Sequence, residues 1–69
     1  MKVEVQHTGG NIYVAIVTLP NGRVLVESDA VEGWFLYASR KAWDIGEDAI
    51  LPLGYADLAT AIRREDTPS

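Results

Sequence analysis

One histidine and no cysteine leave this chain with few side chains suited to acid–base or thiol chemistry near neutral pH. A general base needs a positioned partner within hydrogen-bonding reach. Residues 2–7 alternate between apolar and polar types, so Glu4, the acid nearest to His7 in the sequence, is predicted on the opposite face of the same strand. We therefore interpret His7 as a residue at a strand end beside a glycine turn, and not as a catalytic group.

The hydroxyl groups have equally little support as nucleophiles. None of them lies in a Gly-x-Ser-x-Gly elbow or beside a plausible base, which favours roles in turns, caps and strand packing. Without cysteine there is no thiolate nucleophile or thiolate metal site, and this composition fits a cytoplasmic chain. The sequence thus predicts a protein that is not an enzyme. The hydroxyl residues considered are Thr8, Thr18, Ser28, Ser39, Thr60, Thr67 and Ser69.

The best carboxylate cluster consists of Asp44, Glu47 and Asp48. Calcium prefers several oxygen ligands at close range, in patterns such as Asp-x-Asp-x-Asp-Gly. That pattern is missing here, and Gly46 falls between the acids. We interpret the cluster as a solvated acidic loop and expect neither a bound metal nor a cofactor.

Aromatic residues are concentrated in the middle of the chain, where exposed rings could stack on nucleobases. Such a surface needs neighbouring basic residues, and only Arg40 and Lys41 lie close in sequence. Core packing is the favoured role for most of these aromatic residues, and for any that are exposed, recognition of a protein suits tryptophan and tyrosine as well as base stacking does. Nucleic acid is therefore a disfavoured partner. The residues concerned are Trp34, Phe35, Tyr37 and Trp43.

The composition is that of one folded domain: 69 residues, 48% of them hydrophobic. Ten acidic and six basic residues give a formal net charge of −4, which is unfavourable for binding phosphate backbones. No apolar run approaches the ~20 residues of a membrane span, and the first residues do not form a signal-peptide core. We expect a single domain over residues 1–66 and a disordered tail over residues 67–69, with no membrane partner.

Turn residues and apolar patterns predict an α+β fold, in which an antiparallel meander of four or five strands carries one C-terminal helix on one face. Strands are expected over residues 2–7, 12–19, 23–28 and 33–38, and a helix over residues 55–65. A fifth, short strand is possible at residues 49–53. Residues 39–48 are ambiguous, since Ser39 could cap a short helical turn that Gly46 would end. The alternative is a small closed barrel of the SH3-like kind with a terminal helix.

The stretch Leu19-Pro20-Asn21-Gly22-Arg23 sets the register of the central hairpin, because Gly22 can close the turn with a bulge. Leu19 then lies opposite Arg23, and the strands pair as Thr18–Val24, Val17–Leu25, Ile16–Val26 and Ala15–Glu27. If His7 opposes Ile12, Val3 and Val5 join the same face as Ile16. We predict that this face is the core and that the C-terminal helix covers it. Its other members are Ile12, Val14, Thr18, Val24 and Val26.

The opposite face is predicted to be semi-apolar, and a monomer rarely leaves such a patch bare. The pattern favours a non-enzymatic protein-interaction module. One form would be a small acidic accessory or inhibitory protein of a phage or mobile element. It would block a nucleic-acid-binding host protein, with its carboxylates in place of the phosphates of the nucleic acid. A homodimer that uses the same face is one alternative, and a single-stranded nucleic-acid-binding domain is the other. Whether Trp34 and Leu36, or Phe35 and Tyr37, point outward stays open. The expected partner-binding residues are Tyr13, Val17, Leu25, Trp34 and Leu36, with Asp44, Glu47 and Asp48 as a charged rim.

Overall fold

A computed structural model describes residues 1–10 and 12–66 of the chain, and shows a four-stranded antiparallel sheet followed by two short helices. The strands lie in chain order and the sheet is open, which confirms the α+β meander and excludes the closed barrel. The predicted disordered tail lies outside the described residues. Among those residues, no helix is long and apolar enough to cross a membrane. The elements are β1 (Lys2–Gly9), β2 (Ile12–Thr18), β3 (Val24–Ser28), β4 (Val31–Tyr37), α1 (Arg40–Asp44) and α2 (Leu58–Asp66).

The hairpin between β2 and β3 has the predicted turn and register. The backbone N–H of Leu19 donates to the carbonyl of Arg23 at 2.8 Å, and that of Gly22 donates to the carbonyl of Leu19 at 2.9 Å. Gly22 has a φ of +90°, a conformation that side-chain-bearing residues rarely adopt. All four predicted pairs, from Thr18–Val24 to Ala15–Glu27, are present. The turn sequence therefore predicted correctly which side chains of β2 and β3 lie on each face of the sheet.

The hairpin between β1 and β2 has a different register from the predicted one. His7 pairs with Tyr13, and an irregularity between His7 and Gly9 brings Gly9 opposite Ile12. A shift by one residue moves every side chain of a strand to the other face. Val3 therefore lies opposite Val17, and the prediction that Val3 and Val5 join the face of Ile16 is wrong.

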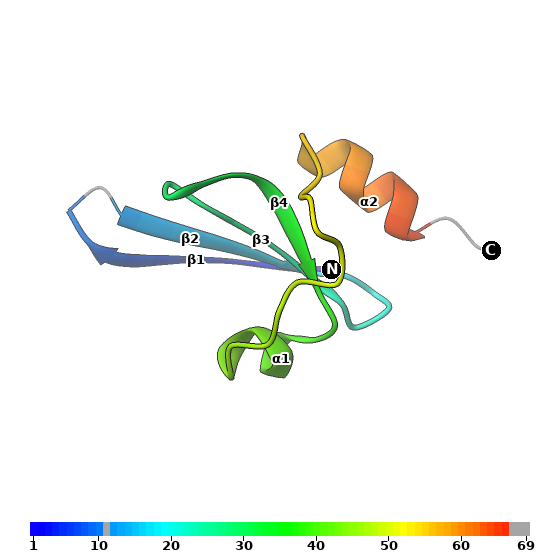
Figure 1. The fold of residues 1–69 in the computed structure, drawn as a ribbon, viewed down its shortest axis with the longest axis horizontal. Helices are drawn as coiled ribbons and strands as arrows, with labels where there is room; N and C mark the ends of the chain where they lie inside the picture. The colour runs from blue at the N-terminus through cyan, green and yellow to red at the C-terminus, as the bar shows by residue number, and fades with distance from the viewer. Residues whose placement is uncertain (11, 67–69) are drawn as a thin grey trace.

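The two helices lie on opposite faces of the sheet, with α2 above it and α1 below it in Figure 1. The predicted placement of α2 is wrong, because it covers the face of Val17 and Leu25 and not the face of Ile16. That face presents leucines, which offer more apolar area to a helix than the valines opposite. Ala61 of α2 is fully buried against it. The buried cluster is Val17, Leu19, Leu25, Leu36 and Ala61, with Trp34, Tyr55, Leu58 and Ile62 packed around it.

The register of β4 decides which of its aromatic residues belong to each face. Leu36 lies opposite Leu25, and Phe35 lies opposite Val26. Trp34 and Leu36 therefore belong to the α2 face, whereas Phe35 and Tyr37 belong to the α1 face. The latter face buries Ile16, Val24 and Val26, with Val14, Tyr37 and Trp43 packed against them.

The ambiguous segment after β4 forms the short helix α1. The side chain of Ser39 accepts a hydrogen bond from the backbone N–H of Ala42 at 3.0 Å, which caps the helix. Gly46, with a φ of +83°, follows its end. Ser39 and Gly46 therefore have the predicted roles at the two ends of α1. The helix between them holds Trp43 against the sheet.

The expected fifth strand at residues 49–53 is absent, and the chain instead follows the outer side of β4. Trp34 and Tyr55 exchange two backbone hydrogen bonds of 2.8 Å as an isolated bridge. Gly33 and Gly54 make this close approach possible, since a Cβ on Gly33 would lie 2.9 Å from the carbonyl oxygen of Tyr55. Because Tyr55 belongs to the bridge, α2 begins at Leu58 and not at residue 55, with Asp57 accepting a hydrogen bond from the N–H of Thr60 at 2.7 Å.

Candidate functional site

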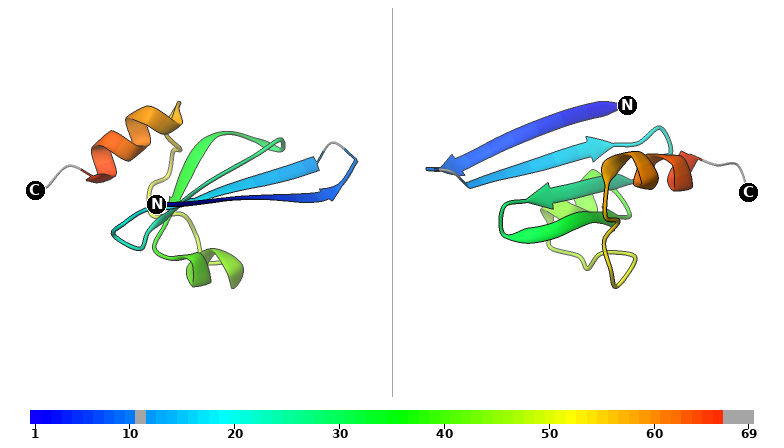
Figure 2. Two further views of the ribbon diagram at one scale, coloured as in Figure 1. Left: turned by 180° about the vertical axis from the view of Figure 1, so that it is seen from behind. Right: turned by 90° about the horizontal axis from the view of Figure 1, so that it is seen from above.

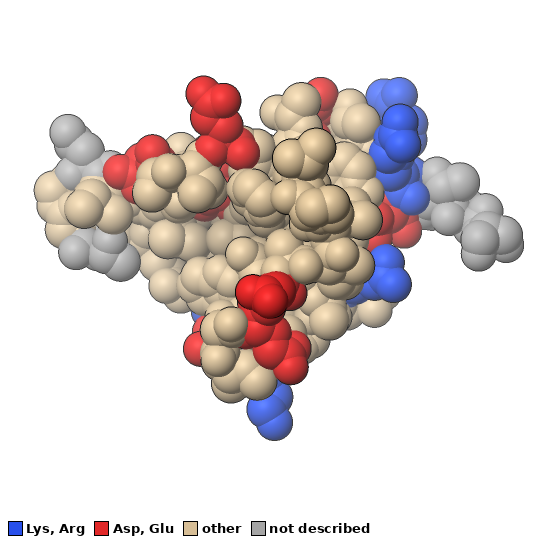
Figure 3. Space-filling model, viewed as in Figure 1, with Lys and Arg blue, Asp and Glu red and all other residues tan. Residues whose placement is uncertain are grey.

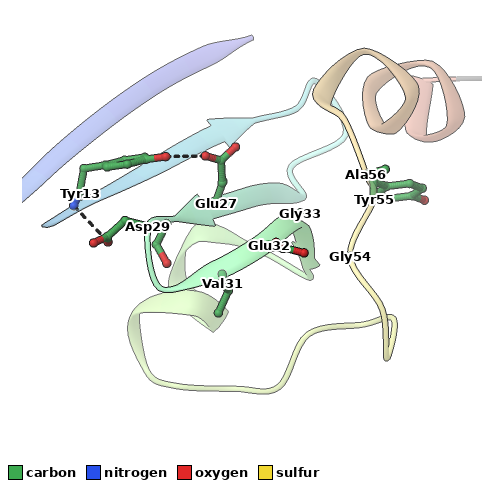
Figure 4. A pocket seen from close by; sticks show the side chains of 10 residues that line it. Tyr13, Glu27, Asp29, Val31, Glu32, Gly33, Gly54, Tyr55 and Ala56 are labelled. Atoms are coloured by element: carbon green, nitrogen blue, oxygen red, sulfur yellow. Dashed lines mark hydrogen bonds between the residues drawn. The ribbon is translucent and has the colours of Figure 1, made fainter. Parts of the chain in front are cut away.

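A hollow of about 660 Å³ lies on the α2 side of the sheet, beside the turn between β3 and β4. Tyr13 of β2 and Glu27 of β3 line one side of it, and the segment from Gly54 to Ala56 lines the other (Figure 4). α2 leaves this end of the sheet uncovered, because the bridge between Trp34 and Tyr55 sets where the chain turns into the helix. The remaining lining residues are Ser28, Asp29, Val31, Glu32 and Gly33.

Tyr13 is held in the hollow by two acidic residues. Its hydroxyl donates to Glu27 Oε1 at 2.7 Å, and its backbone N–H donates to Asp29 Oδ1 at 3.4 Å (Figure 4). The hydrogen bond to Glu27, followed by partial burial, raises the pKa of Tyr13 above its ordinary value. Tyr13 is therefore neutral at neutral pH, and its hydroxyl proton is used in the hydrogen bond to Glu27.

Tyr55 borders the hollow on the opposite side, but its hydroxyl is already engaged elsewhere. It donates to Glu65 Oε2 at 3.0 Å, and Arg23 Nη1 donates to the other oxygen of Glu65 at 3.0 Å. Burial and the bond to Glu65 raise the pKa of Tyr55. This network ties the central hairpin to α2 and holds the ring of Tyr55 in place.

The hollow is acidic, and its own lining does not neutralise it. Glu27, Asp29 and Glu32 line it, and none of its lining residues is a lysine or an arginine. Arg63 and Arg64 lie in the last turn of α2, where Figure 3 shows basic side chains gathered at one end of the long axis of the molecule. The hollow thus presents carboxylates to solvent without a basic side chain in its lining.

An apolar groove of about 380 Å³ opens on the α1 face and meets the hollow at the β3–β4 turn. Ser28 and Val31 line both of them. Trp43 forms one wall of the groove, and Arg40 lies over its ring, with the guanidinium carbon 4.9 Å from the ring centroid. α1 is too short to fill the space that it borders. The groove is lined by Val14, Val26, Ser28, Val31, Phe35, Tyr37 and Trp43.

The structure divides the predicted partner-binding residues into buried and accessible ones. Val17, Leu25 and Leu36 are buried beneath α2, so they do not lie on a surface, and the open face assigned to them is wrong. Trp34 is half-buried against the same cluster. The physical reason is the placement of α2, which covers the face that the sequence analysis left bare. Tyr13 is the one of these five that lines the hollow.

The predicted charged rim lies elsewhere on the molecule. Asp44, Glu47 and Asp48 are exposed at and after the end of α1, and none of them lines the hollow or the groove. Asp44 is paired with Arg40, which also bonds Glu4 of β1 at 3.3 Å. Within residues 1–10 and 12–66, no group of three or more histidine, aspartate and glutamate side chains is arranged to hold a metal ion.

Several of the residues considered for catalysis have structural contacts, whereas Thr67 and Ser69 lie outside the described residues. His7 is exposed on β1, at the edge of the sheet. Ser28 accepts a hydrogen bond from the N–H of Ala30 in the β3–β4 turn, Ser39 caps α1, and Thr60 donates to Asp57 at the start of α2. These contacts match the predicted roles in turns and caps.

Sequence reasoning missed most residues of the hollow and of the groove. The register of β2 and β3 already put Tyr13 and Glu27 on one face, near enough to interact, and this signal could have found their hydrogen bond. Nothing local indicates that Gly54 and Tyr55 come beside Glu32 and Gly33, because that contact joins segments more than twenty residues apart.

No known protein family, no curated protein and no solved structure matches this chain. What the chain does is therefore inferred from the hollow and the groove themselves.

Proposed function

We propose that the chain is a non-enzymatic protein-binding module, which holds a partner segment at the β3–β4 turn. The acidic hollow would accept a lysine or arginine side chain, and the groove beside it would accept an apolar one. The observation that carries the proposal is the junction of the two at Ser28 and Val31, with uncompensated carboxylates on one side and aromatic walls on the other.

This pairing of surfaces suits protein recognition. Arginine and aromatic residues are enriched where binding energy concentrates, and complementary charge directs the encounter. Tyr13 supplies a rigid ring that Glu27 already orients. In the form that we favour, the chain occupies a basic surface of its partner and blocks it, as a small inhibitory protein of a phage or mobile element would, in a reducing cytoplasm.

Binding of single-stranded nucleic acid has weaker support. Phe35, Tyr37 and Trp43 share the groove, and such rings could stack on bases. Arg40, however, is engaged by Glu4, Asp44 and the ring of Trp43, and carboxylates of the adjacent hollow would repel phosphates.

Selection from a random-peptide display library, with the purified chain immobilised, tests the proposal. We expect the enriched peptides to carry a lysine or arginine close to a leucine or an aromatic residue, and to bind more weakly as salt is added. Peptides without this pattern, or no enrichment at all, would overturn the proposal.

Two matched substitutions locate the binding. Glu32→Lys reverses an exposed charge in the hollow, whereas Asp48→Lys reverses an exposed charge outside it. The selected peptides should lose most of their affinity for the first variant and keep it for the second. Equal loss in both variants would mean that net charge, and not the hollow, attracts the peptides.

A further inference from the structure

The outer side of β1 is an uncovered sheet edge. β1 lies beside β2 as the outermost strand, and the right view of Figure 2 shows no other described segment along its far side. An edge strand leaves alternate backbone N–H and C=O groups without partners in the sheet, so it can pair with another strand. Along β1 the side chains of Val3 and Val5 are 64% and 55% exposed.

The opposite edge of the sheet, at β4, is covered by another segment of the chain, so of the two edges only β1 is open. Beyond β4, the N–H of Ile50 donates to the carbonyl of Leu36 at 2.7 Å, and Tyr55 bonds Trp34 in both directions. β1 has little comparable protection. Lys2 stands only at its start, the irregularity lies at its far end, and it contains no proline.

The charge on β1 also differs from the charge on the rest of the chain. Two copies with a net charge of −4 repel each other over most of their surfaces. β1 carries one acid, Glu4, and this is already compensated by Lys2 at 3.8 Å and by Arg40 at 3.3 Å. The edge of β1 is thus a place where two copies can approach without charge repulsion.

We propose that β1 pairs in antiparallel fashion with β1 of a second copy, with Val5 on the two-fold axis, so that two four-stranded sheets become one continuous sheet. In this register Val5 faces its own copy, with Val3 of each chain diagonal to it. Glu4 faces Gln6 of the second copy. A register centred on Glu4 would instead oppose two like charges, which is unfavourable.

This interface lies on a different surface from the proposed peptide site, and its size predicts modest affinity. One pair of strands buries less than the roughly 1,200 Å² at the lower limit of a standard interface. We therefore expect a dissociation constant between about 1 μM and about 1 mM. Sedimentation velocity from about 1 μM to about 1 mM should show monomers that convert to dimers. A monomer throughout this range would overturn the proposal.

Val5→Lys is the direct test, because it places two like charges on the two-fold axis. Val31→Lys is its matched control, since Val31 is an exposed valine, at 47%, in the opposite edge strand. We expect Val5→Lys to stay monomeric and to keep the hollow intact, whereas Val31→Lys should still form dimers. Dimers of Val5→Lys, or loss of dimers in Val31→Lys alone, would overturn the proposal.

Substitutions at Gln6 test the register with little risk to the fold, because Gln6 is exposed. Gln6→Glu opposes Glu4 of the second copy twice in each dimer, whereas Gln6→Lys offers two opposite-charge pairs. We expect the dissociation constant to rise about 2- to 30-fold in the first variant and to fall by a similar factor in the second. The same change in both variants, or none, would contradict the register. Failure of the peptide selection would leave these results unaffected, so the two proposals fail separately.

Discussion

The two faces of the sheet are built from alternate residues of the same strands, yet only on the α2 face does a helix seal the central residues, away from the hollow. We call it the sealed face. On the α2 face, Leu25 and Leu36 lie beneath a nine-residue helix. On the α1 face, a helix of five residues contributes Trp43 and leaves a groove beside Val26. The difference shows that the two faces of so small a chain are packed to different extents. The sealed face buries the larger apolar cluster, and the partly covered face retains an apolar groove, where we propose that a partner binds.

The largest expected effect comes from removing packing on the sealed face. Leu25 is fully buried, and Leu25→Ala should cost about 2–5 kcal/mol of unfolding free energy. A core of this size supplies only about 3–5 kcal/mol in total. Urea titration followed by circular dichroism should therefore find the variant only marginally stable or unfolded in buffer. A stable variant would show that the α2 face is not the principal core.

The second prediction concerns the contact that positions α2. Gly33→Ala places a Cβ 2.9 Å from the carbonyl oxygen of Tyr55, in addition to the strain of a positive φ. Gly46→Ala is the matched control, because Gly46 has a similar φ of +83° and no atom within 4 Å of the added Cβ. The melting temperature should fall much further for Gly33→Ala. Equal losses would mean that backbone strain alone is responsible, and that the bridge does not hold α2.

A direct comparison of the faces uses one substitution on each. Val17 is 1% exposed under α2, and Val26 is 7% exposed at the groove. Val17→Ala should cost about 1.5–3 kcal/mol, and Val26→Ala about 1 kcal/mol less, because water and neighbouring side chains can enter the space at an open groove. Equal values from parallel urea titrations would show that the groove is as tightly packed as the sealed face.

The smallest effect is a pH dependence at the start of α2. The hydrogen bond from the backbone N–H of Thr60, and then that from its hydroxyl, lower the pKa of Asp57 below its usual value of 3.8. A lowered pKa in the folded state stabilises the fold above the usual value, and this contribution disappears as the pH falls through the lowered pKa. The melting temperature should therefore decrease slightly below about pH 4.

Asp57→Asn is the control for this pH dependence, because asparagine caps a helix and does not titrate. It should remove this part of the acid sensitivity and leave stability at neutral pH nearly unchanged. If the acid sensitivity of the variant equals that of the wild type, the carboxylate of Asp57 does not cause it. The decrease in melting temperature on acidification would then have another cause.

Predictions from sequence succeeded where one local signal decides the structure. The turn at Gly22 determined the pairing of β2 with β3, and the Ser39 cap and Gly46 bounded α1 as suggested. They failed at the β1–β2 hairpin, where two glycines permit several turns and the register shifted. They did not bring the residues of the hollow together, since Tyr13 and Glu27 belong to strands whereas Gly54 and Tyr55 come from a distant segment.

Sequence alone was sufficient for the α+β meander, the central register and the division of side chains between two faces, because turn chemistry and alternation act over a few residues. The tertiary structure decided which face α2 covers, and therefore that Val17, Leu25 and Leu36 are core. It also decided that an acidic hollow and an apolar groove meet at one turn. Both apolar faces could have received the helix. The choice depends on the fit of Ala61 and Ile62 against the leucines and on the close approach at Gly33, which are contacts between distant segments that no local pattern specifies.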